Sequence, residues 1–458
     1  MVLTKLISSR EAREKRNVPM SFIFALFLLT SYSYYVLLRI QHNLRILEPR
    51  VSFGDTPDYF FIASQSLFSS SFWIAGKPPV TPLFFKLLES NPDRIMTVQL
   101  WFSILAWGFL AFMVAFVVRS RPLKPLAFLM ILGFSLDQNI IMWDSLILSD
   151  SLALSSLALF LSFSLWLLME WKWYKVILLA SAAVLLAFVR DTYAYWLLLI
   201  AICLLVLLFF TDQRKRVLWV SGIFISLFLA SNALASAGYH WYTPFLMTVG
   251  LRILPNPEYV TYFEGQGMPV SDTLMERSGK PMQADDAAML YDTRLDEFRR
   301  WVKNHGRREY VRFLWFYKAE ALQAPLKDLD IMFNPYLYPY TGTGYRPILT
   351  NARLNEILYP SRFGVFTFFL ANLFAAAVVI PSFQYRQMLC IVPLVLILSS
   401  YPQAVLIWNA DANDIARHSL YHNVELRLGL WLLVFFVMDF LLIDFNLKHG
   451  VRASTAPR

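Results

Sequence analysis

The sequence predicts an all-α polytopic membrane protein with about ten transmembrane helices. Hydrophobic residues make up 57% of the 458-residue chain and charged residues only 16%, whereas soluble globular proteins average about 45–50% and about 25%. The apolar residues fall in separate runs of roughly 20, the length that spans a bilayer as a helix. This pattern excludes a disordered chain and a coiled coil. The net charge is +9, and most of the surplus basic residues lie in short loops between the apolar runs. Basic residues in such loops are typical of proteins that they orient in a membrane, so this charge does not indicate a nucleic-acid partner.

The apolar runs define the predicted transmembrane helices in chain order. They are Met20–Leu38, Met96–Val118, Pro125–Trp143, Ser151–Met169, Val176–Val189, Tyr193–Thr211, Val217–Ala237, Phe363–Ile380, Gln387–Asn409 and Leu428–Ile443. The first run has no signal-peptide cleavage pattern, so we expect it to stay in the protein as a helix. Cys203 and Cys390 both lie inside apolar runs and therefore predict neither a disulfide framework nor a metal pair.

Basic residues set the predicted orientation. If the segments between helices alternate sides, one side carries 17 Lys and Arg residues and the short loops of the other carry three. Because cytoplasmic loops are enriched in Lys and Arg, both termini are expected in the cytoplasm. The localisation that follows is a multi-pass cell-membrane protein.

Two long polar stretches are then expected outside the membrane. Arg39–Ile95 forms a first outer loop, and Gly238–Arg362 forms a larger, nearly neutral loop or domain. The chain is thus expected to comprise a membrane module at 1–237, an extracytoplasmic domain at 238–362 and a second membrane module at 363–458. Within the domain we expect a helix over 285–304 stopped by Gly306, a turn-rich loop over 336–347, and a stretch at 310–317 on the membrane surface.

The first outer loop holds the strongest chemical signal. Asp55 and Asp58 precede an amphipathic stretch at 60–73, and the segment Gly-Lys-Pro-Pro follows with Lys77. A carboxylate near the membrane boundary can serve as general base for a hydroxyl arriving from outside. The alternative interpretation is that one of the two aspartates only caps the helix that follows.

These residues resemble a known family. Asp-x-x-x-Tyr, an amphipathic helix and then Lys-Pro-Pro are similar to the first periplasmic loop of polyprenyl-phosphate-dependent glycosyltransferases of the GT-C fold, in particular the aminoarabinose transferase and protein O-mannosyltransferase group. The resemblance implies that Asp55 is the catalytic base and that Lys77 lies near the donor phosphate. Thr56 stands where the family usually has Glu, and Asp58 where an Arg is common.

The resemblance continues more weakly along the next 150 residues. Leu148-Ser149-Asp150 looks like the family's second acidic position, and Arg190 stands at a turn where the family carries a basic or Gly/Pro motif. The implied partners are a polyprenyl-phosphate-linked sugar donor, a glycan, lipid or protein acceptor, and the bilayer itself. The implied reaction inverts the anomeric carbon, with positive charge from Lys77, Arg190 and Arg417 stabilising the departing phosphate.

A second polar cluster precedes the last helix, at 411–427. Asp414, His418 and His422 are spaced at i, i+4 and i+8, which on a helix could form a metal triad. The other interpretations are a phosphate or acceptor contact through Arg417 and His418, or an interfacial polar loop. No cofactor follows from the sequence with certainty, and a divalent metal ion stays open.

Two carboxylates lie inside predicted helices. Asp137 falls in the outer half of the third helix and is therefore expected to border the site as an accessory acidic residue, together with Asp58 and Asp150. Asp439 lies towards the cytoplasmic end of the last helix, where the side chain can reach the interface.

Other function classes remain open at this stage. A transporter or flippase of lipid-linked saccharides would carry charges near the membrane midplane in repeated halves, and an O-antigen polymerase or ligase also has large outer loops. The chain contains no Asn-x-Ser/Thr acceptor, which favours a bacterial cytoplasmic membrane over a eukaryotic lumenal one.

Overall fold

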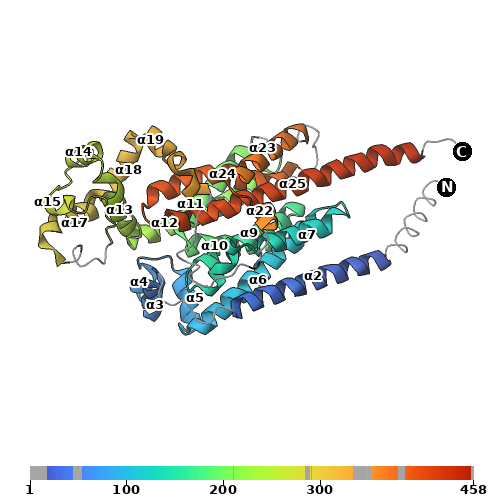
Figure 1. Ribbon diagram of the computed structural model, residues 1–458, viewed down its shortest axis with the longest axis horizontal. Coiled ribbons are helices and arrows are strands. Elements are labelled where there is room, and N and C mark those ends of the chain that lie inside the picture. The colour runs from blue at the N-terminus through green and yellow to red at the C-terminus, as the bar shows by residue number, and fades with distance from the viewer. Residues whose placement is uncertain are drawn as a thin grey trace.

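The computed structural model describes residues 18–44, 54–209, 211–283, 289, 291–333, 348, 352–379 and 387–454. Its regular elements are helices, and no β-strand occurs in the described part of the chain. The prediction of an all-α fold is therefore confirmed for these residues. Long helices run side by side along the longest axis, and a group of short helices lies at one end (Figure 1). We call this the head end of the bundle.

The bundle is built from long apolar helices. They are α2 (Val18–Leu44), α6 (Pro92–Val117), α7 (Leu123–Phe134), α8 (Gln138–Ile141) with η1 (Met142–Ser145), α9 (Asp150–Met169), α10 (Trp173–Val189), α11 (Asp191–Leu207), α12 (Arg214–Ala237), α23 (Arg362–Val379), α24 (Gln387–Ala410) and α25 (Ile415–Ser454). Leucine, alanine and aromatic side chains from most of them form one continuous buried core.

Six of the described helices are long and apolar enough to cross a membrane: α2, α6, α9, α12, α24 and α25. The pair α7 and α8–η1 makes a seventh if the two pieces count as one broken span, because their axes differ by 58°. Three further apolar helices, Trp173–Val189, Asp191–Leu207 and Gly364–Leu373, are shorter than 18 residues. Helices thus occur at each of the ten predicted positions, but length and composition mark only six or seven as spans.

The third predicted helix is broken, which corrects the expectation of one continuous span over 125–143. α7 ends at Phe134, and α8 begins at Gln138 with Asp137 as its N-cap. The Asp137 carboxylate accepts a hydrogen bond from the backbone N–H of Asn139 at 2.8 Å. Serine and aspartate are more common at helix N-caps than in helix interiors, because their side-chain oxygens accept hydrogen bonds from the free backbone N–H groups of the first turn.

The first helix is longer than predicted and buries a charge. α2 continues to Leu44, so Arg39 belongs to the helix and not to the outer loop. The Arg39 guanidinium forms an ion pair with Asp144 and donates to Ser103 Oγ (2.6 Å) and to the carbonyl of Ser135 (3.0 Å). Both partners of the ion pair are buried. An arginine in an apolar helix needs such compensation, which a hydropathy window does not detect.

The head end consists of two groups of short helices. The first loop forms α3 (Thr56–Ser64), α4 (Ser70–Trp73) and α5 (Val80–Leu87), so the predicted amphipathic stretch at 60–73 is two helices joined by a turn. The second group is α13 (Tyr242–Thr248), η2 (Val249–Ile253), α14 (Pro257–Gly265), α15 (Asp272–Met275), η3 (Thr293–Leu295), α17 (Asp296–Trp301), η4 (Val302–Gly306) and α18 (Arg307–Phe316). This second group, residues 242–317, has its own hydrophobic core and is called the head domain.

The helix predicted over 285–304 does not stop at Gly306. α17 passes through the single π-helical turn η4 directly into α18. Position 306 in this continuous stretch needs a glycine, because the Cβ of any other residue would come within 2.9 Å of the Phe245 ring. The glycine therefore serves close packing and not helix termination. The predicted loop at 336–347 lies outside the described residues.

The chain after the head domain returns to the bundle. α19 (Lys318–Gln323), η5 (Ala324–Asp328), α20 (Leu329–Phe333) and α22 (Ala352–Leu358) pack along the bundle and not into the head-domain core. Residues 411–427, predicted as a loop, are mostly helical: α24 ends at Ala410 and α25 begins at Ile415. Inside the protein Arg417 pairs with Asp150 and Arg427 donates to backbone carbonyls, which lets the helix continue through a polar sequence.

Candidate functional site

Five charged side chains from distant parts of the sequence meet at the head end of the bundle. Asp55 precedes α3, Lys77 lies between α4 and α5, Asp150 begins α9, Arg190 joins α10 to α11, and Arg417 lies in the first turn of α25. Figure 1 shows α3–α5 and the near ends of these long helices at the same end of the molecule. We call these five residues the charge cluster.

Asp55 connects the exposed and the buried parts of the cluster. Asp55 Oδ1 lies 2.7 Å from Lys77 Nζ, and Asp55 Oδ2 lies 3.1 Å from Arg417 Nη1. Asp55 occupies the N-cap position of α3 but makes no capping hydrogen bond with its side chain. The capping interpretation is therefore wrong for this carboxylate. The Asp55 side chain keeps 29% of its surface exposed, against 4% for Arg417, so it is the member of that pair that a ligand can reach.

Asp150 forms the buried centre of the cluster. Its carboxylate, which has no exposed surface, lies 2.8 Å from Arg417 Nη2 and 2.7 Å from Arg190 Nη2. Arg417 Nε donates to Asp150 as well, and Tyr421 OH donates to Asp150 Oδ1 at 2.5 Å. Buried ion pairs persist only when such bonds satisfy their remaining lone pairs and protons. Asp150 therefore fixes the positions of two guanidinium groups, of which Arg417 also contacts Asp55.

Two further predicted residues lie at the edge of the cluster. Asp58 Oδ2 is 3.4 Å from Lys77 Nζ, and its side chain is 62% exposed. His418 Nδ1 lies 3.2 Å from Arg190 Nη1, and His418 Nε2 lies 3.5 Å from Asp411. The structure thus brings together seven of the eight residues that the sequence assigned to a catalytic, phosphate-binding or accessory acidic role; the eighth is Asp137.

The cluster controls the ionisation of its own members. Burial alone would raise the pKa of the Asp55 carboxyl, but Lys77 and Arg417 together outweigh burial and hold that pKa well below its usual range. Burial alone would lower the pKa of the Lys77 ammonium, but Asp55 outweighs it and raises that pKa above its usual value. Both groups are consequently charged at neutral pH. With three basic and two acidic members, the cluster carries a formal surplus of one positive charge.

Sequence reasoning missed the residues that support the cluster. Ser149 Oγ accepts hydrogen bonds from Arg190 Nε and Tyr59 OH, both at 3.2 Å. His240 links Asp191 Oδ2 to the carbonyl of Ala75, two residues before Lys77, with both contacts at 2.7 Å. Tyr421 could have been found, because it follows Arg417 by one helical turn. No sequence signal marks His240.

The loop that carries Lys77 is packed closely against the end of α12. A Cβ at Gly238 would lie 2.2 Å from the carbonyl oxygen of Ala75. We expect Gly238→Ala to lower the free energy of unfolding by about 1–3 kcal/mol, since added volume forces this backbone to move. Gly222→Ala on the same helix is the control, because that position has open space and alanine favours helix. Thermal unfolding in detergent measures both; equal midpoints would contradict the packing.

The metal triad is not formed. Asp414 precedes α25 with a φ of 51°, so it does not share a helix face with His418 and His422. His422 is fully buried, and its ring packs against Phe333. In the part of the chain that the structure describes, no group of three or more His, Cys, Asp or Glu side chains could hold a metal ion.

Neither of the two carboxylates inside predicted transmembrane helices contacts the cluster in the interactions described. Asp137 caps α8, and no hydrogen bond or ion pair described for it reaches the cluster. Asp439 Oδ1 accepts from the backbone N–H groups of Arg119 and Ser120 at 2.9 and 2.6 Å. Asp439 therefore fixes the turn between α6 and α7, at the end of α6 opposite to the one that the first loop enters.

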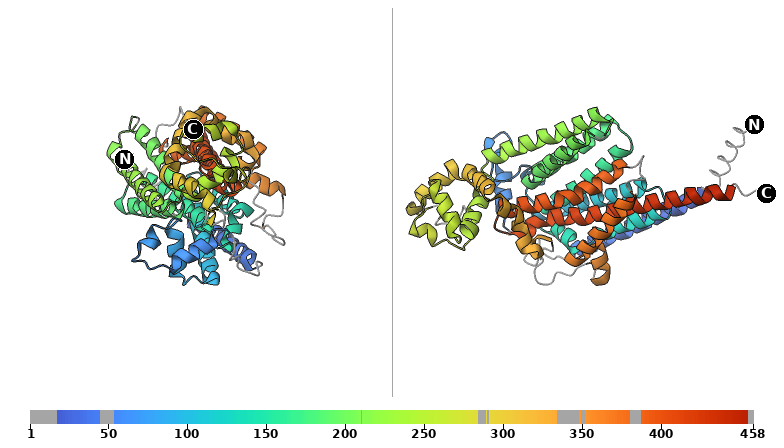
Figure 2. Two further views of the ribbon diagram at one scale, coloured as in Figure 1. Left: turned by 90° about the vertical axis from the view of Figure 1, so that its left-hand side faces the viewer. Right: turned by 90° about the horizontal axis from the view of Figure 1, so that it is seen from above.

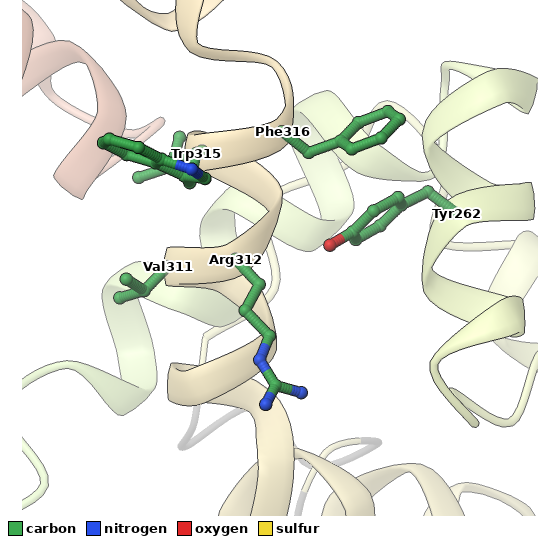
Figure 3. Close-up of a pocket in the computed structure, with 6 residues that line it drawn as sticks. Tyr262, Val311, Arg312, Trp315 and Phe316 are labelled. Atoms are coloured by element: carbon green, nitrogen blue, oxygen red, sulfur yellow. The ribbon is translucent and has the colours of Figure 1, made fainter.

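A separate hollow lies in the head domain. It is lined by side chains of α14 and α18, including Tyr262, Val311, Arg312, Trp315 and Phe316. In Figure 3, Phe316 faces Tyr262 while Val311 and Trp315 project from the other side of α18. None of these residues belongs to the charge cluster, and the hollow offers one charged side chain only.

Comparison with known proteins adds no relative: a scan against protein-family models and a search of the curated proteins both find no match.

Proposed function

We propose that the protein is a membrane glycosyltransferase of the GT-C type. In this proposal it transfers a sugar from a polyprenyl-phosphate donor to a glycan, lipid or protein acceptor. The observation that supports it most is the position of Asp55, a partly exposed carboxylate held between Lys77 and Arg417. This site lies at the end of an apolar helical bundle, where a lipid-linked anomeric carbon and a water-borne hydroxyl can meet.

The proposed reaction uses these groups in defined roles. The acceptor oxygen forms a bond to the anomeric carbon, while the bond from that carbon to the phosphate oxygen breaks and leaves polyprenyl phosphate with the electron pair. Asp55 takes the acceptor proton. Lys77 and Arg417 stabilise the negative charge that develops on the phosphate. Attack opposite to the leaving group inverts the anomeric carbon.

Donor binding activates the base in this scheme. Asp55 is a weak base while Lys77 and Arg417 lower its pKa. A donor phosphate offers the same two cations oxygen acceptors, and Arg binds phosphate in the bidentate way that it binds carboxylate. When the phosphate takes these contacts from Asp55, the carboxylate becomes more basic. The proton acceptor is thus strengthened only when a donor is present.

The proposed topology is a multi-pass protein in a bacterial cytoplasmic membrane, with both termini in the cytoplasm and the head end outside. The N-terminal end of α2 and the C-terminal end of α25 lie together, opposite to the head domain (Figures 1 and 2). If the broken pair and the three shorter apolar helices also cross the membrane, the number of spans is even and the chain ends on the side where it begins. The Lys/Arg distribution supports the same arrangement.

The test is an assay of the purified protein in liposomes with a panel of radiolabelled polyprenyl-phosphate sugars. We expect one label to leave the lipid and appear on an added acceptor. Movement of an intact labelled lipid across the bilayer, without transfer, would instead identify a flippase. No use of any donor in the panel by protein that remains folded would contradict the proposal.

Lys77 gives a residue-level test. Lys77→Ala should lower transfer by about 10²–10³-fold, because one contact to the developing phosphate anion is lost. Lys77→Arg should retain part of the rate, since it keeps the charge. The Lys77 side chain is 26% exposed, so circular dichroism of both variants should match the parent. Full activity of Lys77→Ala would remove this residue from the site.

A further inference from the structure

The segment that follows the head domain has one apolar exposed side. α19, η5 and α20 cover Lys318–Phe333. Leu322, Leu326 and Leu329 are 55%, 50% and 37% exposed, and their spacing of four and three residues places them on one side. Ala324 and Met332 in the same segment are buried. A contiguous exposed apolar surface of this kind usually marks a contact with another protein or with a membrane.

Hydrogen bonds hold this segment along two candidate spans. Asn409 Nδ2 donates to the carbonyl of Ala321 at 3.0 Å, and Tyr401 OH donates to the carbonyl of Leu322 at 2.6 Å. Both donors belong to α24, whose candidate span is Leu389–Ala410. Tyr401 lies eight residues before Asn409, or about 12 Å along the helix. The start of the segment is therefore level with the last turns of a span.

The other end of the segment is fixed by α25. Asn423 Nδ2 donates to the carbonyl of Met332 at 2.6 Å, and Arg427 Nη2 donates to the carbonyl of Phe333 at 2.9 Å. These donors are inside the candidate span Ile415–Ile443. Backbone carbonyls at the end of a short helix need such donors when water is excluded.

Two charged side chains at the start of the segment, Lys318 and Glu320, contact the head domain. Glu320 accepts a hydrogen bond from Tyr259 OH at 2.6 Å. Lys318 Nζ lies 5.3 Å from the centroid of the exposed Trp315 ring. Lysine and tryptophan side chains of this kind are enriched where a protein meets the membrane–water boundary. On α24, exposed Leu398 and Tyr401 continue the apolar surface below Leu322.

From this arrangement we infer that Lys318–Phe333 lies in the lipid interface of the head-side leaflet, with Leu322, Leu326 and Leu329 in contact with acyl chains. The partner is the bilayer itself, because the leucine side continues the lipid-facing surface of a candidate span. The segment thereby anchors the head domain above the charge cluster. The inference concerns membrane placement and does not depend on the proposed reaction.

Nitroxide labels test the inference on the full chain in phosphatidylcholine–phosphatidylglycerol liposomes. Single cysteines replace Leu322, Leu326 or Leu329 in a Cys203→Ala/Cys390→Ala background, and Gly265→Cys and Lys327→Cys are controls on exposed positions. The three leucine positions should relax more with oxygen and several-fold less with a water-soluble nickel chelate than the controls. Half-exposed leucines contribute little packing, so the variants should fold.

Two outcomes would overturn the inference. Equal access of the nickel chelate to the leucine positions and to Gly265 would place the segment in water. Exclusion of both relaxants together with dipolar broadening between labels would place a second copy of the chain on this surface. If one variant fails to fold, as judged by gel filtration, the two remaining leucine positions give the result.

Discussion

Asp55→Asn is expected to lower the rate of sugar transfer by about 10²–10⁴-fold, the usual loss when a general base is removed. The asparagine keeps the shape of the side chain and one acceptor oxygen for Lys77 or Arg417, and Arg417 keeps its pair with Asp150, so the fold should persist. Donor binding should not weaken, because Asp55 competes with the donor phosphate for the same two cations. Single-turnover transfer and equilibrium binding of a labelled donor measure the two quantities separately.

Asp58→Asn is the matched control. Asp58 also contacts Lys77, but at 3.4 Å and with an exposed side chain, so its exchange should change transfer by less than about tenfold, as exposed ion pairs contribute little. If Asp58→Asn were inactive and Asp55→Asn active, the two roles would be reversed. Activity of both variants would leave the proposed reaction without a base.

The sequence predicts helix positions well because apolar runs of about 20 residues have few alternatives to a helix in lipid. It also predicts most of the charge cluster, since charged residues at the ends of apolar runs must gather where the runs end. Asp150 and Arg190 illustrate this, as each begins or ends a helix.

Other features depend on contacts between distant residues and could not be predicted from local pattern. Arg39 lies in α2 only because Asp144, 105 residues later, compensates its charge. The charged stretch 411–427 is helical from Ile415 onward because Arg417 pairs with Asp150 and Arg427 donates to the carbonyls of Phe333 and Pro360. Local composition indicates a loop in this case, whereas tertiary pairing stabilises a helix.

Asp150→Asn should have the largest effect on stability. The Asp150 carboxylate is the only ion-pair partner of Arg190 among the described residues and one of those of Arg417. Removing its charge leaves the buried Arg190 guanidinium without an ion-pair partner, while Arg417 keeps Asp55; breaking a buried pair in this way typically costs about 3–5 kcal/mol. We expect a lower denaturation midpoint in detergent, followed by tryptophan fluorescence, and loss of folded protein at physiological temperature.

Two variants separate this charge effect from a general sensitivity to substitution. Glu89→Gln removes a carboxylate that pairs with Arg94 where both side chains are exposed; its midpoint should not change, because water compensates exposed charges. Adding Arg190→Gln to Asp150→Asn should recover part of the lost stability, since it removes a buried charge that has lost its partner. A double variant less stable than Asp150→Asn would show that Asp150 acts through packing and not through charge.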